Sequence, residues 1–401
     1  MGKGIAITGM GIISAIGNNL EETYTSLIEE NTGISKVKKI DTVHKDSILV
    51  GEISATNQEL AQHLDLSVDN NYTRTALLGA YAAKQAINNA GITNINMYRT
   101  GLISASSVGG MDMTEKYYYR YLEDKSVQKY IEAHPIGDST HKIAQYIGIQ
   151  QSMITSISTA CSSGANAIML GARLIKSGKL DRVIVGGADC LSKFTINGFK
   201  TLMILSDGHN TPFDANRKGL NLGEAAAFLV LESDEVIKKS KKKILGYVRG
   251  YGNANDAFHQ TASSENGNGA TLAMKKAIQV AKLKHNEIDY INAHGTATEN
   301  NDLSEGRAII RVFGENNIPD FSSTKPYTGH TLAAAGAIEA VFAVFALQNN
   351  VVFPSLNHNT PMNELDCIPQ TSLKKKEIRN VLSNSLGFGG NCTAIIFSKE
   401  P

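Results

Sequence analysis

The sequence of 401 residues predicts an α/β fold made of two halves with one shared topology. Apolar strand-like runs alternate with helix-like segments along the chain, which favours buried strands covered by helices. With 42% hydrophobic and 19% charged residues, the chain can bury a large core. One pattern of strand, turn, helix and strand pair occurs twice, and this repeat predicts the two halves.

The first copy of this pattern is a strand at 153–158, a turn that contains Cys161, and an apolar helix at 165–175. A strand pair at 182–186 and 225–231 completes it. The second copy has the same four parts, namely a strand at 321–324, a turn with Lys325 and His330, a helix at 332–347, and a strand pair at 380–385 and 392–397. Both helices lack a polar face, so we expect both to be buried where they begin.

The two copies predict intimately packed halves at 1–250 and 251–401, joined near residues 240–255. Because we expect the two halves to share an extensive interface, we do not expect them to be independent domains.

Charge and cysteine content narrow the function classes. The formal net charge of +1 does not favour a nucleic-acid binder. Cys161, Cys190, Cys367 and Cys392 form no C-x-x-C pair, which argues against a zinc site and a disulfide framework and suits a reducing cytosol. The apolar run at the N-terminus is too short for a signal peptide or a transmembrane helix. We therefore expect a soluble cytoplasmic protein without a metal site.

Cys161 lies in Ser-Thr-Ala-Cys-Ser-Ser-Gly, between a strand and a helix rich in small residues. At a helix N-terminus, free N–H groups and the helix dipole favour a thiolate. A sharp turn also leaves the backbone N–H of Cys161 free to bind an oxyanion. The alternative is a buried, inert cysteine, the usual fate of a free Cys.

Two histidines follow predicted buried strands. His294 lies in Asn-Ala-His-Gly-Thr-Ala-Thr, and His330 lies in Gly-His-Thr at the start of the second apolar helix. An isolated histidine is more often a structural residue, but α/β sites gather where strands end. One cysteine with two such histidines is a coherent catalytic group. The turn at 387–390, Gly-Phe-Gly-Gly, either lets the backbone approach a ligand or is an ordinary hairpin turn.

Four motifs in this order resemble the elongating β-ketoacyl-acyl-carrier-protein synthases, which are condensing enzymes of the thiolase fold. The motifs are Ser-Thr-Ala-Cys161-Ser-Ser-Gly, Asn-Ala-His294-Gly-Thr-Ala-Thr, Lys325-Pro-Tyr-Thr-Gly-His330 and Asn384-Ser-Leu-Gly-Phe388-Gly-Gly. The similarity extends from Ile5 to the last strand. It implies a five-layered α-β-α-β-α fold of two pseudo-symmetric halves. It also implies an acyl carrier protein as partner, and usually a homodimer, with a heterodimer with a chain-length-factor paralogue as the alternative.

The resemblance also implies roles for the site residues. Cys161 is expected to receive an acyl group as a thioester, while His294 and His330 stabilise the enolate formed when a malonyl unit loses carbon dioxide. The backbone N–H groups of Cys161 and Phe388 would form the oxyanion hole. No metal or redox cofactor is expected, because decarboxylation drives the reaction and the 4'-phosphopantetheine arrives on the carrier protein.

Supporting residues follow from the same resemblance. They are Lys325 for electrostatic support of the histidines, Asp302 and Glu339 as buried supporting residues, Thr261, Thr296 and Thr298 for the phosphopantetheine arm, and Val108, Phe199 and Leu386 for the acyl pocket. For Val108 and Phe199, plain core packing is the alternative.

Several positions depart from the family pattern and leave the acyl substrate open. Lys218 stands where Asp is more common, Leu386 replaces a common Phe, and Asn391-Cys392 replaces Thr-Asn. Residues 70–74 carry one positive charge where the family often has several for docking an acidic carrier protein. Primary fatty acid synthesis and a specialised polyene or polyketide pathway both remain open, as do chain length and saturation.

Four rival classes share parts of this pattern. A non-catalytic chain-length-factor-like subunit lacks the reactive cysteine. A thiolase needs a second cysteine in a Cys-Gly-x-Gly loop, which Cys392 does not reproduce. The initiating condensing enzymes use Cys-His-Asn, whereas the third position here is His330. Nothing in the sequence indicates a water-accessible acyl-enzyme, as a cysteine hydrolase would need.

Overall fold

A computed structural model describes residues 4–67, 69–150 and 153–401, and these residues form one mixed sheet of ten strands. From edge to edge the strands are β11 (Asp320–Ser322), β10 (Tyr290–Asn292), β14 (Asn380–Leu386), β15 (Asn391–Ser398), β9 (Gly246–Asn255), β1 (Ile5–Ser14), β8 (Ala225–Glu232), β6 (Arg182–Asp189), β4 (Thr100–Ala105) and β5 (Ile154–Ile157).

The two halves of this sheet repeat strand by strand. The order β1-β8-β6-β4-β5 in one half corresponds to β9-β15-β14-β10-β11 in the other, and the two first strands, β1 and β9, pair antiparallel at the centre. Both predicted strand pairs form, β6 with β8 and β14 with β15, each antiparallel. Strand β9 runs across the predicted boundary at residue 250.

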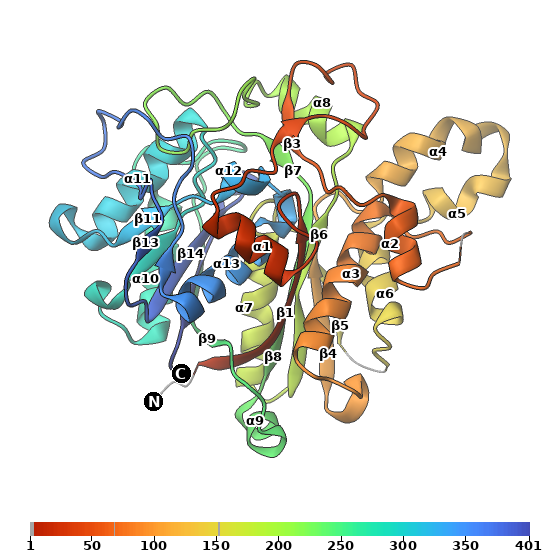
Figure 1. Ribbon diagram of the computed structural model, residues 1–401, viewed down its shortest axis with the longest axis horizontal. Helices are drawn as coiled ribbons and strands as arrows, with labels where there is room; N and C mark the ends of the chain where they lie inside the picture. The colour runs from red at the N-terminus through yellow and green to blue at the C-terminus, as the bar shows by residue number, and fades with distance from the viewer. Residues whose placement is uncertain (1–3, 68, 151–152) are drawn as a thin grey trace.

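Helices cover both outer faces of the sheet halves and fill the space between them (Figure 1). Helices α3 (Arg74–Asn89) and α6 (Ile136–Tyr146) cover the first half, and α10 (Asn268–Ala281) and α11 (Glu299–Phe313) cover the second. Helices α7 (Ser163–Lys176) and α13 (Ala335–Asn349) form the central layer. These layers give the α-β-α-β-α arrangement that the sequence predicts.

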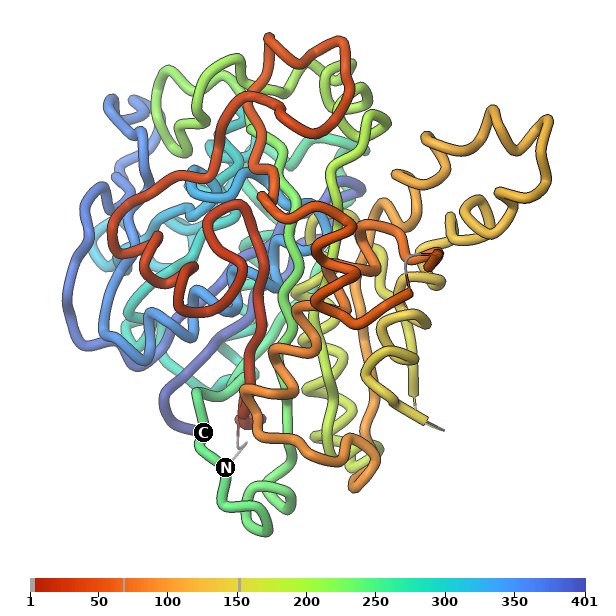
Figure 2. Tube along the Cα trace, turned by 45° about the vertical axis from the view of Figure 1, so that its right-hand side comes forward, coloured from red at the N-terminus to blue at the C-terminus, as the bar shows by residue number. Residues whose placement is uncertain are grey.

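The remaining elements surround this frame. Helices α4 (Met111–Glu123) and α5 (Gln128–Ile131) project away from the body of the molecule (Figure 2). The remaining helices are α1 (Leu20–Ile28), α2 (Asn57–His63), α8 (Lys193–Thr201), α9 (Asp234–Ser240) and α12 (Lys325–Thr328). There are also two small sheets. One contains β2 (Ser35–Lys36), β3 (Leu49–Gly51) and β7 (Leu222–Gly223), and the other contains β12 (Val351–Val352) and β13 (Lys374–Lys375).

The central helices touch backbone to backbone where they begin. A Cβ on Gly164 would lie 2.8 Å from the carbonyl oxygen of Ala333, and a Cβ on Gly336 would lie 2.7 Å from the nitrogen of Ala165. Glycine at both positions therefore allows this close approach. The expected burial of both helix starts is confirmed.

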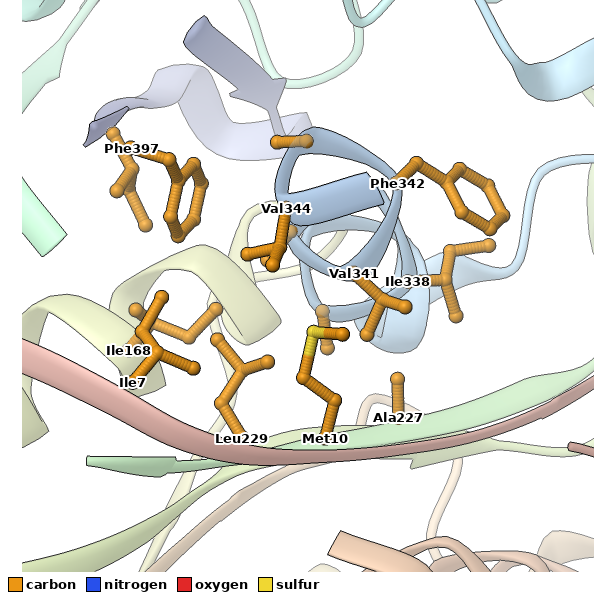
Figure 3. Close-up of a cluster of buried hydrophobic side chains, with 14 of the residues drawn as sticks. Ile7, Met10, Ile168, Ala227, Leu229, Ile338, Val341, Phe342, Val344 and Phe397 are labelled. Carbon is orange, nitrogen blue, oxygen red and sulfur yellow. The ribbon is translucent and has the colours of Figure 1, made fainter. Parts of the chain in front are cut away.

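Apolar side chains fill the central layer. Val341 of α13 points toward Met10 and Leu229 on the sheet, and Ile338 and Phe342 project from the side of the same helix into the same buried cluster (Figure 3). The window Leu332–Asn349 is long and apolar enough to cross a membrane, but 89% of it is buried inside the protein, as in a core helix.

Candidate active site

Three loops at the carboxyl ends of strands converge on one point. Cys161 follows β5, His294 follows β10, and His330 lies beyond β11, the parallel neighbour of β10. Because α7 and α13 touch where they begin, the turns that precede them are neighbours. The Nε2 of His330 lies 2.9 Å from the Sγ of Cys161, and both residues are buried.

A buried ion pair fixes the protonation of His294. The Nζ of Lys325 lies 2.6 Å from the Oε1 of Glu339 and 3.3 Å from the Nδ1 of His294. An ammonium group can only donate, so the Nδ1 accepts and a neutral imidazole carries its proton on Nε2. Burial, followed by the charge of Lys325, holds the pKa of His294 well below its usual range. His294 is therefore a neutral hydrogen-bond donor.

Burial also determines the state of the nucleophile. It raises the pKa of Cys161 to about 12, although the charge of Lys325 and the backbone N–H of Phe388 act in the opposite direction. Burial therefore favours a neutral thiol in the resting protein over the expected thiolate. Burial and Lys325 likewise hold the pKa of His330 well below its usual range. The pair is a neutral thiol beside a neutral imidazole.

This assignment predicts the pH dependence of alkylation by iodoacetamide. Only the thiolate reacts, so the rate at Cys161 should rise about tenfold per pH unit between about pH 6 and 9, without a plateau. Mass spectrometry of the Cys161 peptide measures the rate, and Cys161→Ala gives the background. A plateau below about pH 8 would mean that the thiol ionises far more easily than burial allows.

The loop after β14 supplies a second backbone donor. The N–H of Phe388 is directed at the thiol of Cys161, where it lowers the thiol pKa. Gly387 packs against the same turn, because its Cβ would lie 3.3 Å from the nitrogen of Cys161. The N–H groups of Cys161 and Phe388 thus flank one position beside the sulfur.

A cavity of about 350 Å³ connects this group with the surface. Cys161, His294 and His330 line it together. Most of the predicted binding residues line the same cavity, namely Thr261, Thr296, Thr298, Phe199, Leu386 and Phe388. The Phe199 ring stacks on Phe388 at 6.0 Å.

Val108 is the exception among the predicted pocket residues. It does not line the cavity. Its side chain packs in the core cluster of the first half, and its N–H donates to the carboxylate of Asp189. Plain core packing is the alternative to a pocket role for Val108, and its burial in this cluster favours that alternative.

Buried carboxylates hold the site loops. Asp302 accepts the N–H groups of Ala297 and Phe213, as a supporting residue would. The sequence analysis missed Glu305, which accepts the N–H groups of His294 and Gly295, each at 2.8 Å. It also missed Asp189, the last residue of β6, whose buried carboxylate accepts the N–H of Ala333 just before the second central helix. A Glu three positions after Asp302, on the same helix face, was the available signal for Glu305.

Models of known families match both halves of the chain. The model described as "Beta-ketoacyl synthase, N-terminal domain" matches residues 3–236. The model described as "Beta-ketoacyl synthase, C-terminal domain" matches residues 245–359.

Similar proteins cover the full length of the chain. The 3-oxoacyl-[acyl-carrier-protein] synthase 2 of Staphylococcus aureus (strain N315) is 33% identical over 99% of this chain and 98% of its own length. The solved ishigamide ketosynthase/chain length factor superposes with a TM-score of 0.93 at 28% identity over the whole of both chains. A ketosynthase (ApeO) in complex with its chain length factor (ApeC), from Xenorhabdus doucetiae, gives a TM-score of 0.86 at 31% identity over 99% and 98% of the two chains.

Proposed function

The chain belongs to the β-ketoacyl synthase family of condensing acyltransferases, and from that premise we propose how its own residues carry out the reaction. It is a β-ketoacyl-acyl-carrier-protein synthase, which joins an acyl group to a malonyl unit with loss of carbon dioxide. The contact of 2.9 Å between Cys161 and His330 carries the proposal for the first half-reaction.

In that half-reaction the thiol of Cys161 takes up the acyl group. The neutral Nε2 of His330 accepts the thiol proton as the sulfur attacks the thioester carbonyl carbon. The N–H groups of Cys161 and Phe388 hold the oxyanion. The carbon–sulfur bond to the carrier then breaks, and the leaving thiolate receives the proton from His330.

In the second half-reaction a malonyl thioester occupies the same cavity. The Nε2–H of His294 donates to the carbonyl oxygen while the bond to the carboxylate breaks and carbon dioxide leaves. His330 donates to the same oxygen after exchange with solvent has moved its proton from Nδ1 to Nε2. The enolate carbon attacks the acyl thioester on Cys161. A carbon–carbon bond forms, and the released sulfur regains a proton from solvent. Lys325 keeps His294 in the donor tautomer.

The same proposal covers partners and location. Thr261, Thr296 and Thr298 bind the phosphopantetheine arm of an acyl carrier protein along the cavity. The enzyme needs no metal or redox cofactor, because decarboxylation drives the second step. It works in the cytoplasm as a homodimer, or paired with a chain-length-factor paralogue, as the names of two similar structures suggest for those proteins.

Product analysis tests this function directly. The enzyme is incubated with malonyl-carrier protein and acyl-carrier proteins of different chain length and saturation, and the products are analysed by intact mass. We expect a β-ketoacyl-carrier protein two carbons longer than the best acyl donor. If no donor yields a β-keto product, with or without a chain-length-factor paralogue, the function is wrong.

A further inference from the structure

The turn that carries the nucleophile is strained and needs support from its neighbours. Ala160, directly before Cys161, has a φ of 52°, in the left-handed region that a residue with a Cβ rarely adopts. Such a conformation persists when surrounding contacts impose it. Some of these contacts are local, since the N–H of Thr159 donates to the Oγ of Ser163 at 2.7 Å and the hydroxyl groups of Ser162 and Ser163 donate to the carbonyl oxygens of Thr159 and Ala160. Further contacts come from the opposite half of the protein.

The side chain of Asn391, the first residue of β15, contacts the start of α7, beside the hydrogen bonds that Asn253 and Thr393 donate to the Oδ1 of Asn166. The Oδ1 of Asn391 accepts from the Oγ of Ser162 at 2.8 Å and from the Nδ2 of Asn166 at 2.9 Å, both at the start of α7. The Nδ2 of Asn253, on β9, donates to the same oxygen at 2.9 Å. Ser162 and Asn166 are buried, so without the Asn391 side chain each would lose a hydrogen-bond partner that water could not easily replace.

The backbone of Asn391 closes the other loop of the oxyanion hole. Its carbonyl oxygen accepts the N–H of Gly387 at 2.8 Å, directly before Phe388. A Cβ on Gly387 would lie 2.7 Å from the carbonyl oxygen of Thr159. The two loops therefore meet without a side chain between them, and their relative position depends on the residue that binds both.

We propose that Asn391 is a positioning residue that sets the distance between the two oxyanion-hole donors, the N–H groups of Cys161 and Phe388. Its side chain holds the nucleophile turn and its backbone holds the glycine-rich turn at 387–390. The inference rests on the proposed function, because it concerns the oxyanion of the acyl-transfer step. It also gives a role to a position at which this chain departs from the common Thr of its family.

Two reactions of the same thiol separate positioning from general structural damage. Acyl transfer from an acyl-carrier protein passes through an oxyanion, whereas alkylation of Cys161 by iodoacetamide does not. In Asn391→Ala we expect the acylation rate to fall about 10- to 100-fold, less than the loss of a whole oxyanion donor. The alkylation rate should stay within about threefold of the wild type, since it depends on the thiolate fraction and not on two aligned oxyanion donors.

Two variants serve as matched comparisons. Asn391→Asp keeps an acceptor oxygen in the same place and should restore acylation to within a few-fold of wild type. Asn380→Ala removes a buried amide that joins the same two strands, β14 and β15, at the end away from the site. It should lower thermal stability but leave the ratio of acylation to alkylation unchanged.

The ratio of acylation to alkylation in these variants tests the role of Asn391. A ratio of acylation to alkylation that is unchanged in Asn391→Ala, or that falls equally in Asn380→Ala, would overturn it. If Asn391→Ala does not fold, Ser162→Ala removes one donor to the same oxygen and must lower the ratio, and an unchanged ratio there also overturns it. Wild-type enzyme that no acyl-carrier protein acylates would instead contradict the proposed function.

Discussion

Cys161→Ala should abolish covalent acyl attachment and lower the condensation rate by at least about 10³-fold. The sulfur is the one nucleophile that lies beside both His330 and the N–H of Phe388 in the part of the chain that the structure describes. Intact-protein mass spectrometry after incubation with acyl-carrier protein measures the attachment. Malonyl decarboxylation should continue, because His294 and Lys325 keep their contacts in this variant.

Cys367→Ala is the matched control for this variant. Cys367 is a free cysteine that does not line the cavity, so its loss should leave the acyl adduct and the condensation rate unchanged. An acyl adduct that persists in Cys161→Ala would place the nucleophile elsewhere. Condensation by the chain together with a ketosynthase partner that is unchanged without Cys161 would favour a non-catalytic, chain-length-factor-like role.

The fold could be predicted from the sequence because the pattern of strand, turn, helix and strand pair is local and occurs twice. Two apolar helices with small residues at their starts indicate a buried central layer, and Gly164 and Gly336 show why small residues are needed there. The four motifs place Cys161, His294 and His330 at strand ends, and the strand order then brings them together. The order of the strands therefore follows from the sequence pattern, but the motifs do not give the distances between the site residues.

The protonation states could not be predicted in the same way. A cysteine near a helix N-terminus suggests a thiolate, but the burial that raises its pKa to about 12 depends on residues far away in the chain. Glu305 was missed for a related reason. On an amphipathic helix a Glu suggests a solvent-facing position, and the tertiary fold turns it toward the N–H groups of the His294 loop.

His294→Ala should separate the two half-reactions. His294 contacts Lys325, whereas the contact to the thiol belongs to His330. Acylation of Cys161 should therefore stay within about threefold of wild type. Malonyl decarboxylation should fall about 10²- to 10³-fold, as expected for the loss of one aligned donor to a developing oxyanion. Carbon dioxide release from malonyl-carrier protein and the mass of the acyl-enzyme measure the two steps separately.

His285→Ala provides the comparison, because His285 is exposed and lies outside the cavity. Both half-reactions should be unchanged in that variant. Loss of acylation with decarboxylation retained in His294→Ala would reverse the roles of the two histidines. Equal loss of both steps would mean that the positions of Cys161 and His330 also depend on the contact between His294 and the ion pair of Lys325 and Glu339. Selective loss of decarboxylation is the result expected if Lys325 keeps a neutral imidazole aimed at the enolate.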